Sequence, residues 1–139
     1  MKNAGYTIIG DYLISAWGEV TLSSDEEQEM LAFFKTLDLE RIRCLVFTKG
    51  AAPTAMMRKH MHDALGGREM MAAIVTDVYF MRGIVTTMSW FNKQVRAFPS
   101  SALESALRYL EIPPDQYELF RRESVKLQAA VAVRSARRR

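Results

Sequence analysis

The chain has 139 residues, of which 49% are hydrophobic, and this is enough for one domain with a buried core. Its formal net charge of +3 comes from the end, because residues 134–139 contain four arginines and no acid. The rest of the chain is close to neutral, which argues against a specific nucleic-acid partner. No apolar run approaches the roughly 18 residues needed to span a membrane, and no signal sequence opens the chain, so we expect a cytoplasmic protein.

The first predicted elements are a hairpin and a helix. Residues 6–9 and 12–17 predict two antiparallel strands, and Gly10-Asp11 forms the turn between them. The helix that follows runs to about Leu37. Its start matches a Ser-x-x-Glu capping box in two registers, Ser23 with Glu26 or Ser24 with Glu27.

Strands and helices then alternate along the chain. Residues 43–48 form a continuous apolar run, typical of a strand that is buried on both faces. We expect after it, in order, a helix at 54–65, a strand at 70–76, a helix at 77–91, a strand at 94–98, a helix at 102–110 and a last helix from 112–115 to about 134. This alternation predicts an α/β fold with a mixed, mostly parallel sheet. We place one domain at residues 1–112, and an added amphipathic C-terminal helix with a basic tail at 113–139.

Three segments carry a resemblance to a known family. They are Trp17-Gly-Glu-Val-Thr21, Cys44-Leu-Val-Phe47, and Val95-Arg-Ala-Phe98 leading into the helix that ends at Leu110. In element order and hydrophobic pattern, roughly residues 5 to 112 resemble the SpoIIAA-like, or STAS-related, domains. The resemblance implies a single STAS-like domain that is regulatory and not catalytic. In the anti-sigma-factor antagonists of this group, phosphorylation of a Ser or Thr at the start of the helix after the central strand switches partner binding.

The segment that matches this switch is the loop at residues 48–54. It departs from the Asp-Ser pattern of the antagonists, and Thr54 is the hydroxyl at the helix start. Ligands usually bind an α/β sheet at the carboxyl end of a strand and the amino end of a helix. Lys49 and the free backbone amides could therefore hold an anion, or a phosphate placed on Thr54. The alternative is an ordinary connection in which Pro53 starts the helix.

The predicted helix at 77–91 carries an unusual outer face. Val78 and Met81 belong to its inward apolar face, whereas the opposite face has two aromatic side chains with a glycine and a threonine between them. These four residues are Tyr79, Gly83, Thr86 and Trp90. Aromatic residues are frequent energetic centres of interfaces, so this face is a candidate for partner binding. The alternative is that the same chain covers it, most plausibly with the last helix.

The last helix supplies a narrow apolar seam. Its members recur at alternating spacings of three and four residues: Tyr117, Phe120, Ser124, Leu127 and Val131. The seam needs a surface to bury it. Three alternatives stay open: docking on its own body, pairing with another subunit, and contact with another partner or a membrane surface.

Signals for metal binding and catalysis are weak. Cys44 lies in an apolar strand, where burial raises the pKa of a thiol and makes it a poor nucleophile. His60 and His62 point about 200° apart on a helix and cannot share a metal ion. No catalytic triad, dinucleotide fingerprint or paired carboxylates in an apolar setting are present. We therefore expect no metal, no cofactor and no enzymatic activity.

These observations predict a non-enzymatic regulatory or scaffolding module that binds a protein partner or itself, with a homo-oligomer expected. The contact would combine the aromatic face with the seam of the last helix. The alternative is a carrier or sensor of a small apolar or anionic ligand, held in a Met-lined cavity or at the loop that contains Lys49 and Thr54. The terminal arginines 137–139 add at most a weak contact with an anionic surface.

Overall fold

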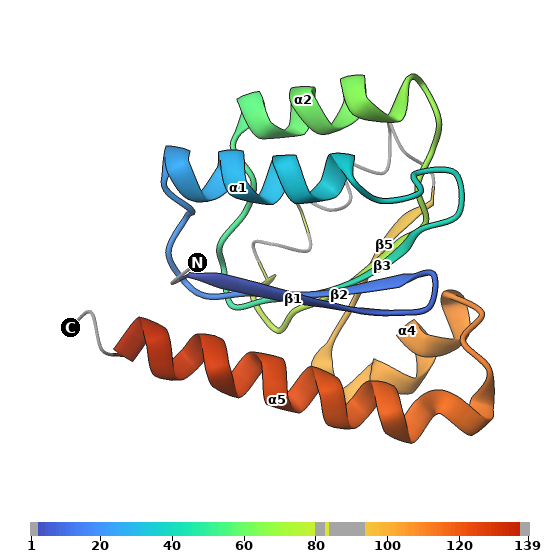
Figure 1. Cartoon of the computed structure of the whole chain (residues 1–139). Helices are drawn as coiled ribbons and strands as arrows, with labels where there is room; N and C mark the ends of the chain where they lie inside the picture. Colours follow the sequence, from blue (N-terminus) through green and yellow to red (C-terminus); the bar gives the residue numbers. More distant parts are fainter. Residues whose placement is uncertain (1–2, 80–82, 84–93, 137–139) are drawn as a thin grey trace.

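The computed structural model describes residues 3–79, 83 and 94–136. A five-stranded sheet forms the middle layer, with α1 (Ser24–Lys35) and α2 (Ala55–Leu65) above it and α4 (Leu103–Tyr109) and α5 (Tyr117–Ala136) below it (Figure 1). Two short 3₁₀ turns, Ser100–Ala102 and Pro114–Gln116, lead into α4 and α5.

The sheet confirms the predicted mixed, mostly parallel arrangement. Its strands are β1 (Ala4–Ile9), β2 (Tyr12–Trp17), β3 (Arg43–Thr48), β4 (Ala72–Val75) and β5 (Val95–Phe98). They lie side by side in chain order, with β1 antiparallel to β2 and the remaining neighbours parallel. The carboxyl ends of β2, β3, β4 and β5 therefore meet at one edge of the sheet, which we call the carboxyl edge.

The helix starts follow their local sequence signals. Of the two possible capping boxes, the structure contains Ser23 with Glu26, in which each side chain accepts from the other residue's backbone amide. Thr54 is the N-cap of α2, and its hydroxyl accepts a hydrogen bond from the amide of Met57. The predicted helix at 77–91 lies mostly outside the described residues, although Tyr79 and Gly83 are helical.

Strand alternation divides the core between the two faces of the sheet. On β2, Leu13 packs toward α1 and α2, whereas its neighbour Ile14 packs toward α4 and α5. On β3, Cys44 and Leu45 divide in the same way. Both faces of the central strands are thus covered, as the continuous apolar run of β3 predicted.

The seam of α5 docks on its own sheet, the first of the three alternatives. Phe120 is fully buried and Val131 is 3% exposed, in one core cluster with residues of β2, β3 and β4. The ring of Tyr12 meets the ring of Phe120 edge to face, with centroids 5.3 Å apart. The expectation that Phe120 and Val131 bind a partner is therefore wrong, because burial against the sheet already occupies them.

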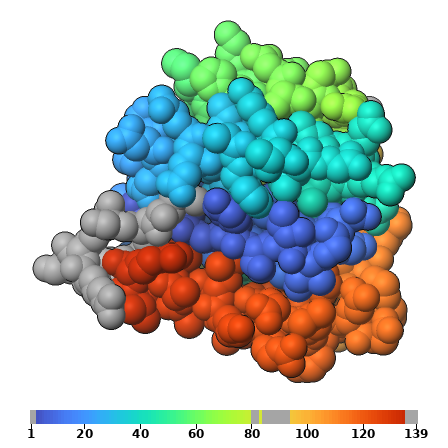
Figure 2. All heavy atoms as spheres, in the orientation of Figure 1, coloured from blue at the N-terminus to red at the C-terminus, as the bar shows by residue number. Residues whose placement is uncertain are grey.

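The other seam residues pack on the same core. Tyr117 and Leu127 are half-buried and contact it from its margin, and Ser124 is 1% exposed. Figure 2 shows the same arrangement from outside: the blue hairpin of β1 and β2 fills the surface between α1 and the red α5. Little of the seam is left for another molecule.

Candidate functional site

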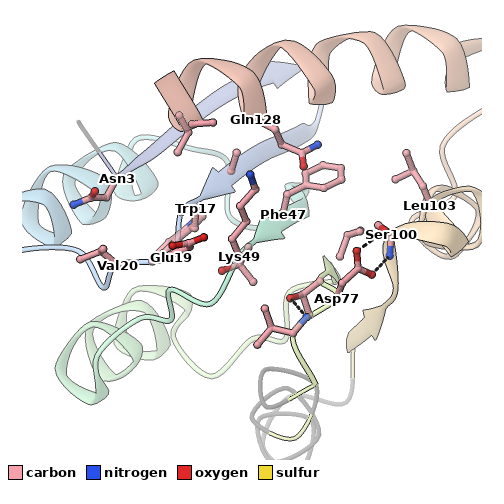
Figure 3. A pocket seen from close by; sticks show the side chains of 18 residues that line it. Asn3, Trp17, Glu19, Val20, Phe47, Lys49, Asp77, Ser100, Leu103 and Gln128 are labelled. Atoms are coloured by element: carbon pink, nitrogen blue, oxygen red, sulfur yellow. Dashed lines mark hydrogen bonds between the residues drawn. The ribbon is translucent and has the colours of Figure 1, made fainter. Parts of the chain in front are cut away.

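A pocket of about 700 Å³ lies at the carboxyl edge of the sheet, between the ends of β2, β3 and β4 and the second half of α5 (Figure 3). Trp17, Thr48 and Thr76 line it where each of these strands ends, and Gln128 lines it from α5. Open α/β sheets usually bind ligands just outside the carboxyl ends of their strands, and this pocket has that position.

Most polar groups of the pocket stabilise its own loops. The Thr48 hydroxyl donates to the carbonyl of Ala51 at 2.7 Å. The Asp77 carboxylate accepts from both the amide and the hydroxyl of Ser100, at 2.9 and 2.5 Å. Both bonds of Asp77 join the segment after β4 to the start of the 3₁₀ turn after β5, so they hold one wall of the pocket in place.

Lys49 is the exception among these groups. Its side chain leaves the β3–α2 loop and extends across the pocket toward α5 and Gln128 (Figure 3). Within residues 3–79, 83 and 94–136, no carboxylate or other acceptor pairs with its ammonium group. Lys49 therefore brings to the pocket an ammonium group that has no ion pair among the described residues, while the carboxylates of Glu19 and Asp77 also line the pocket.

Exposed apolar side chains border the same edge. Val20 is 57% exposed, Met56 is 66% exposed and Tyr79 is 86% exposed. Val20 and Tyr79 come three and four residues after the ends of β2 and β4, and Met56 is the second residue of α2, the helix that follows β3. These three strands are neighbours in the sheet. We call these three residues the edge row. Of the predicted aromatic face, Tyr79 and Gly83 are both exposed, and Thr86 and Trp90 lie outside the described residues.

Comparison with known proteins identifies the fold of the chain. No family model and no curated protein matches the chain. A solved structure does match: an uncharacterized protein from the DUF3478 family, from Shewanella loihica PV-4, whose crystal structure has a SpoIIAA-like fold. The match covers 77% of this chain and 91% of the other, with 17% sequence identity and a TM-score of 0.56. This chain has a SpoIIAA-like fold.

In this SpoIIAA-like fold the helix start after β3 is already paired. The Glu27 carboxylate of α1 accepts from the backbone amide of Thr54 at 3.1 Å and from its hydroxyl at 2.9 Å. A negatively charged group thus already sits at the amino end of α2, which favours anions. A phosphate on Thr54, or an anion bound by this helix start, would have to displace Glu27. Lys49 and Thr54 consequently belong to different environments, the first in the pocket and the second against α1.

Two titratable groups of the SpoIIAA-like domain have strongly shifted pKa values, and both serve the fold. Burial raises the pKa of the Cys44 thiol to about 12. Burial also disfavours the charged form of Glu26, but hydrogen bonds donated by Asn3 and Ser23 together outweigh it and hold the pKa at about 2. Neither side chain lines the pocket.

Metal ligands do not gather in the described part of the domain. His60 and His62 are both exposed on α2, and in residues 3–79, 83 and 94–136 no three His, Cys, Asp or Glu side chains lie close enough to hold an ion. The same ranges contain no helix with the length and apolar character needed to cross a bilayer.

Sequence reasoning missed several features of this edge. Val20 and Met56 lie outside every amphipathic pattern, and the order of the strands shows that their segments leave the same edge of the sheet as the segment of Tyr79. Gln128 belongs to α5, and its approach to Lys49 depends on how α5 docks. One signal was available: Val20, Lys49 and Tyr79 come soon after a predicted strand, and Met56 lies near the start of a predicted helix that follows one. Ligands usually bind at this edge of a parallel sheet.

Proposed function

We propose that this protein is a non-enzymatic interaction module, and that it binds a protein partner through the carboxyl edge of its sheet. SpoIIAA-like folds are typically non-catalytic, and as a class they suggest regulation through protein contacts at most. The single observation that carries the proposal is the edge row of Val20, Met56 and Tyr79, three exposed apolar side chains in the segments that follow three adjacent strands.

The composition of the edge row supports a protein interface. Exposed apolar residues that stand alone are common, but several along one edge are typical of contact surfaces. Tyrosine offers a large contact area and is enriched among residues that dominate binding energy, and methionine adapts to differently shaped partners. The row also continues onto the pocket, because Val20 lines it.

The rest of the exposed surface offers a comparison. Val125 and Val133 of α5 are 64% and 53% exposed, but they lie on a helix face away from the sheet. They match Met56 and Val20 in exposure and therefore serve as controls.

The experiment replaces each residue of the edge row with glutamate, as Val20→Glu, Met56→Glu and Tyr79→Glu, and compares Val125→Glu and Val133→Glu. Because all five side chains are exposed, each variant should fold with a melting temperature close to the wild type. Quantitative mass spectrometry after chemical crosslinking in the native host would measure partner recovery. A true partner is recovered with the wild type and both controls, and its yield falls at least tenfold with Met56→Glu and Tyr79→Glu.

Light scattering after size exclusion decides whether the partner is a second copy of the chain. A dimer that the edge-row variants dissociate would identify self-association through this edge. The proposal is wrong if the edge-row variants and the α5 controls recover the same proteins and have the same mass. Removing α5 would not be informative, because it would expose the core around Phe120.

A further inference from the structure

The pocket at the carboxyl edge holds one positive charge that the described protein leaves unpaired. Lys49 extends into it, and no described side chain accepts from its ammonium group (Figure 3). Gln128 of α5 lies on the opposite wall and faces Lys49, so a ligand between the two walls would lie beside the ammonium group (Figure 3).

Several described polar groups near Lys49 already have hydrogen-bond partners. The Trp17 indole donates to the Ser15 hydroxyl at 2.6 Å, and Thr76 accepts from the amide of Val78 at 3.1 Å. The Gln128 amide nitrogen donates to the carbonyl of Ser124 at 3.2 Å, so the side chain is held in position. Among the described residues that line the pocket, Lys49 is therefore the cation available to a ligand, and the neighbouring polar groups named here already have partners.

The remaining wall is apolar. Phe47 and Val75 line it from the sheet, Leu103 from the start of α4 and Val131 and Ala132 from α5. A volume of about 700 Å³ lies within the range of small-molecule pockets, roughly 300–1,000 Å³, which are mostly apolar with a few well-placed polar groups. The wall thus suits a hydrophobic body several carbon atoms long.

We propose that this pocket binds an organic monocarboxylate with an apolar body, such as a medium-chain fatty acid. The Lys49 ammonium pairs with the carboxylate, and the hydrocarbon lies against Phe47, Leu103 and Val131. Asp77 and Glu19 also line the pocket and repel each negative charge of a ligand, so a monoanion paired with Lys49 is opposed less than a phosphate dianion. This proposal does not rest on the protein contact proposed above, although Val20 of the edge row also lines the pocket.

Isothermal titration calorimetry with decanoate, kept below its critical micelle concentration, tests the site on the full chain. We expect a single site on the wild type and affinity about tenfold lower for Lys49→Gln, since a charge-assisted hydrogen bond is lost. Lys49→Arg should retain most of the affinity. The matched control is Lys59→Gln, an exposed lysine of α2 outside the pocket, which should bind like the wild type.

Three further measurements distinguish the contribution of the Lys49 charge from that of the apolar wall and of the edge row. Decanol should bind the wild type and Lys49→Gln equally, because it has no charge, and inorganic phosphate should not compete with decanoate. Ala132→Trp fills the pocket from an exposed position and should abolish binding of both amphiphiles. Tyr79→Glu and Met56→Glu should leave decanoate binding unchanged. The ligand proposal and the partner proposal can therefore be contradicted independently of each other.

Several results would overturn the proposal. The first is that the wild type does not bind decanoate at millimolar concentration, and the second is that wild type and Lys49→Gln bind it with equal affinity. The others are that Ala132→Trp binds decanoate like the wild type, and that phosphate displaces decanoate. Circular dichroism of each variant establishes that it is folded before its titration is interpreted.

Discussion

Glu26 shows how one buried carboxylate can hold two segments together. It is 8% exposed and accepts hydrogen bonds from the backbone and side chain of Asn3, both at 3.1 Å, and from the amide of Ser23 at 3.2 Å. The residue before β1 is thereby tied to the start of α1. These bonds explain why its pKa stays at about 2 despite burial, which acts in the opposite direction.

The lowered pKa of Glu26 makes a pH-dependent contribution to stability. Its folded pKa of about 2 lies below the ordinary value of 4.5, so the contribution is complete above pH 4.5 and disappears as the pH falls toward 2. Glu26→Gln should reduce the free energy of unfolding by about 1–3 kcal/mol at pH 7 and by much less near pH 2. Urea titrations at both pH values measure this, with exposed Glu29→Gln as the control. An equal loss at both pH values would contradict it.

Cys44 is predicted to be chemically inert in the folded protein. It is 4% exposed, its Sγ lies 3.5 Å from the Met70 sulfur, and burial raises its pKa to about 12. Because only the thiolate attacks disulfide reagents, Ellman's reagent at pH 8 should label the native protein at a rate set by its opening. Labelling should become rapid and stoichiometric in denaturing urea. Immediate reaction of the native protein would mean that the thiol is accessible.

At the scale of elements, the docking of α5 depends on a glycine of β1, in the sheet on which the helix packs. A Cβ atom added to Gly5 would lie 2.8 Å from Arg134 Nη2 and 3.0 Å from Leu127 Cδ1. Arg134 also donates to the carbonyl of Ala4 at 3.3 Å, so the end of α5 contacts the backbone of β1 directly. The helix can lie this close because β1 has no side chain at this position.

Gly5 substitutions test this close approach. Gly5→Ala should cost about 1 kcal/mol, since the two contacting atoms are ends of flexible side chains, and Gly5→Leu should cost more than 2 kcal/mol because it overpacks the contact. Thermal unfolding measures both. Gly10→Asn is the control, because a Cβ there meets nothing within 4 Å and Asn tolerates its φ of 58°. Equal stability of Gly5→Leu and wild type would show that α5 does not need this contact.

At the scale of the whole molecule, the strand order determines where function can lie. Parallel β2, β3 and β4 bring three loops to one edge, and α5 closes the pocket there from below. The edge row and the Lys49 pocket share this edge, so a bound amphiphile and a bound protein would be neighbours. The glutamate variants of the edge row and the Lys49 variants separate the two activities experimentally.

Much of this architecture could be predicted from local patterns. The hairpin at Gly10-Asp11, the capping box at Ser23, the buried run of β3 and the alternation of strands with helices all depend on residues a few positions apart. Such signals act through backbone conformation and side-chain periodicity, and these depend little on the rest of the chain. The order of elements in turn predicted the mixed sheet.

Contacts between distant residues were decided only by the tertiary structure. The spacing from Tyr117 to Val131 indicated that α5 has an apolar seam, but the seam would look the same whether its own sheet or another subunit covered it. Likewise, nothing local pairs Glu27 with Thr54 or brings Gln128 toward Lys49. By itself the sequence determined which faces must be buried. What buries them, and which charge remains free at the carboxyl edge, depends on packing in three dimensions.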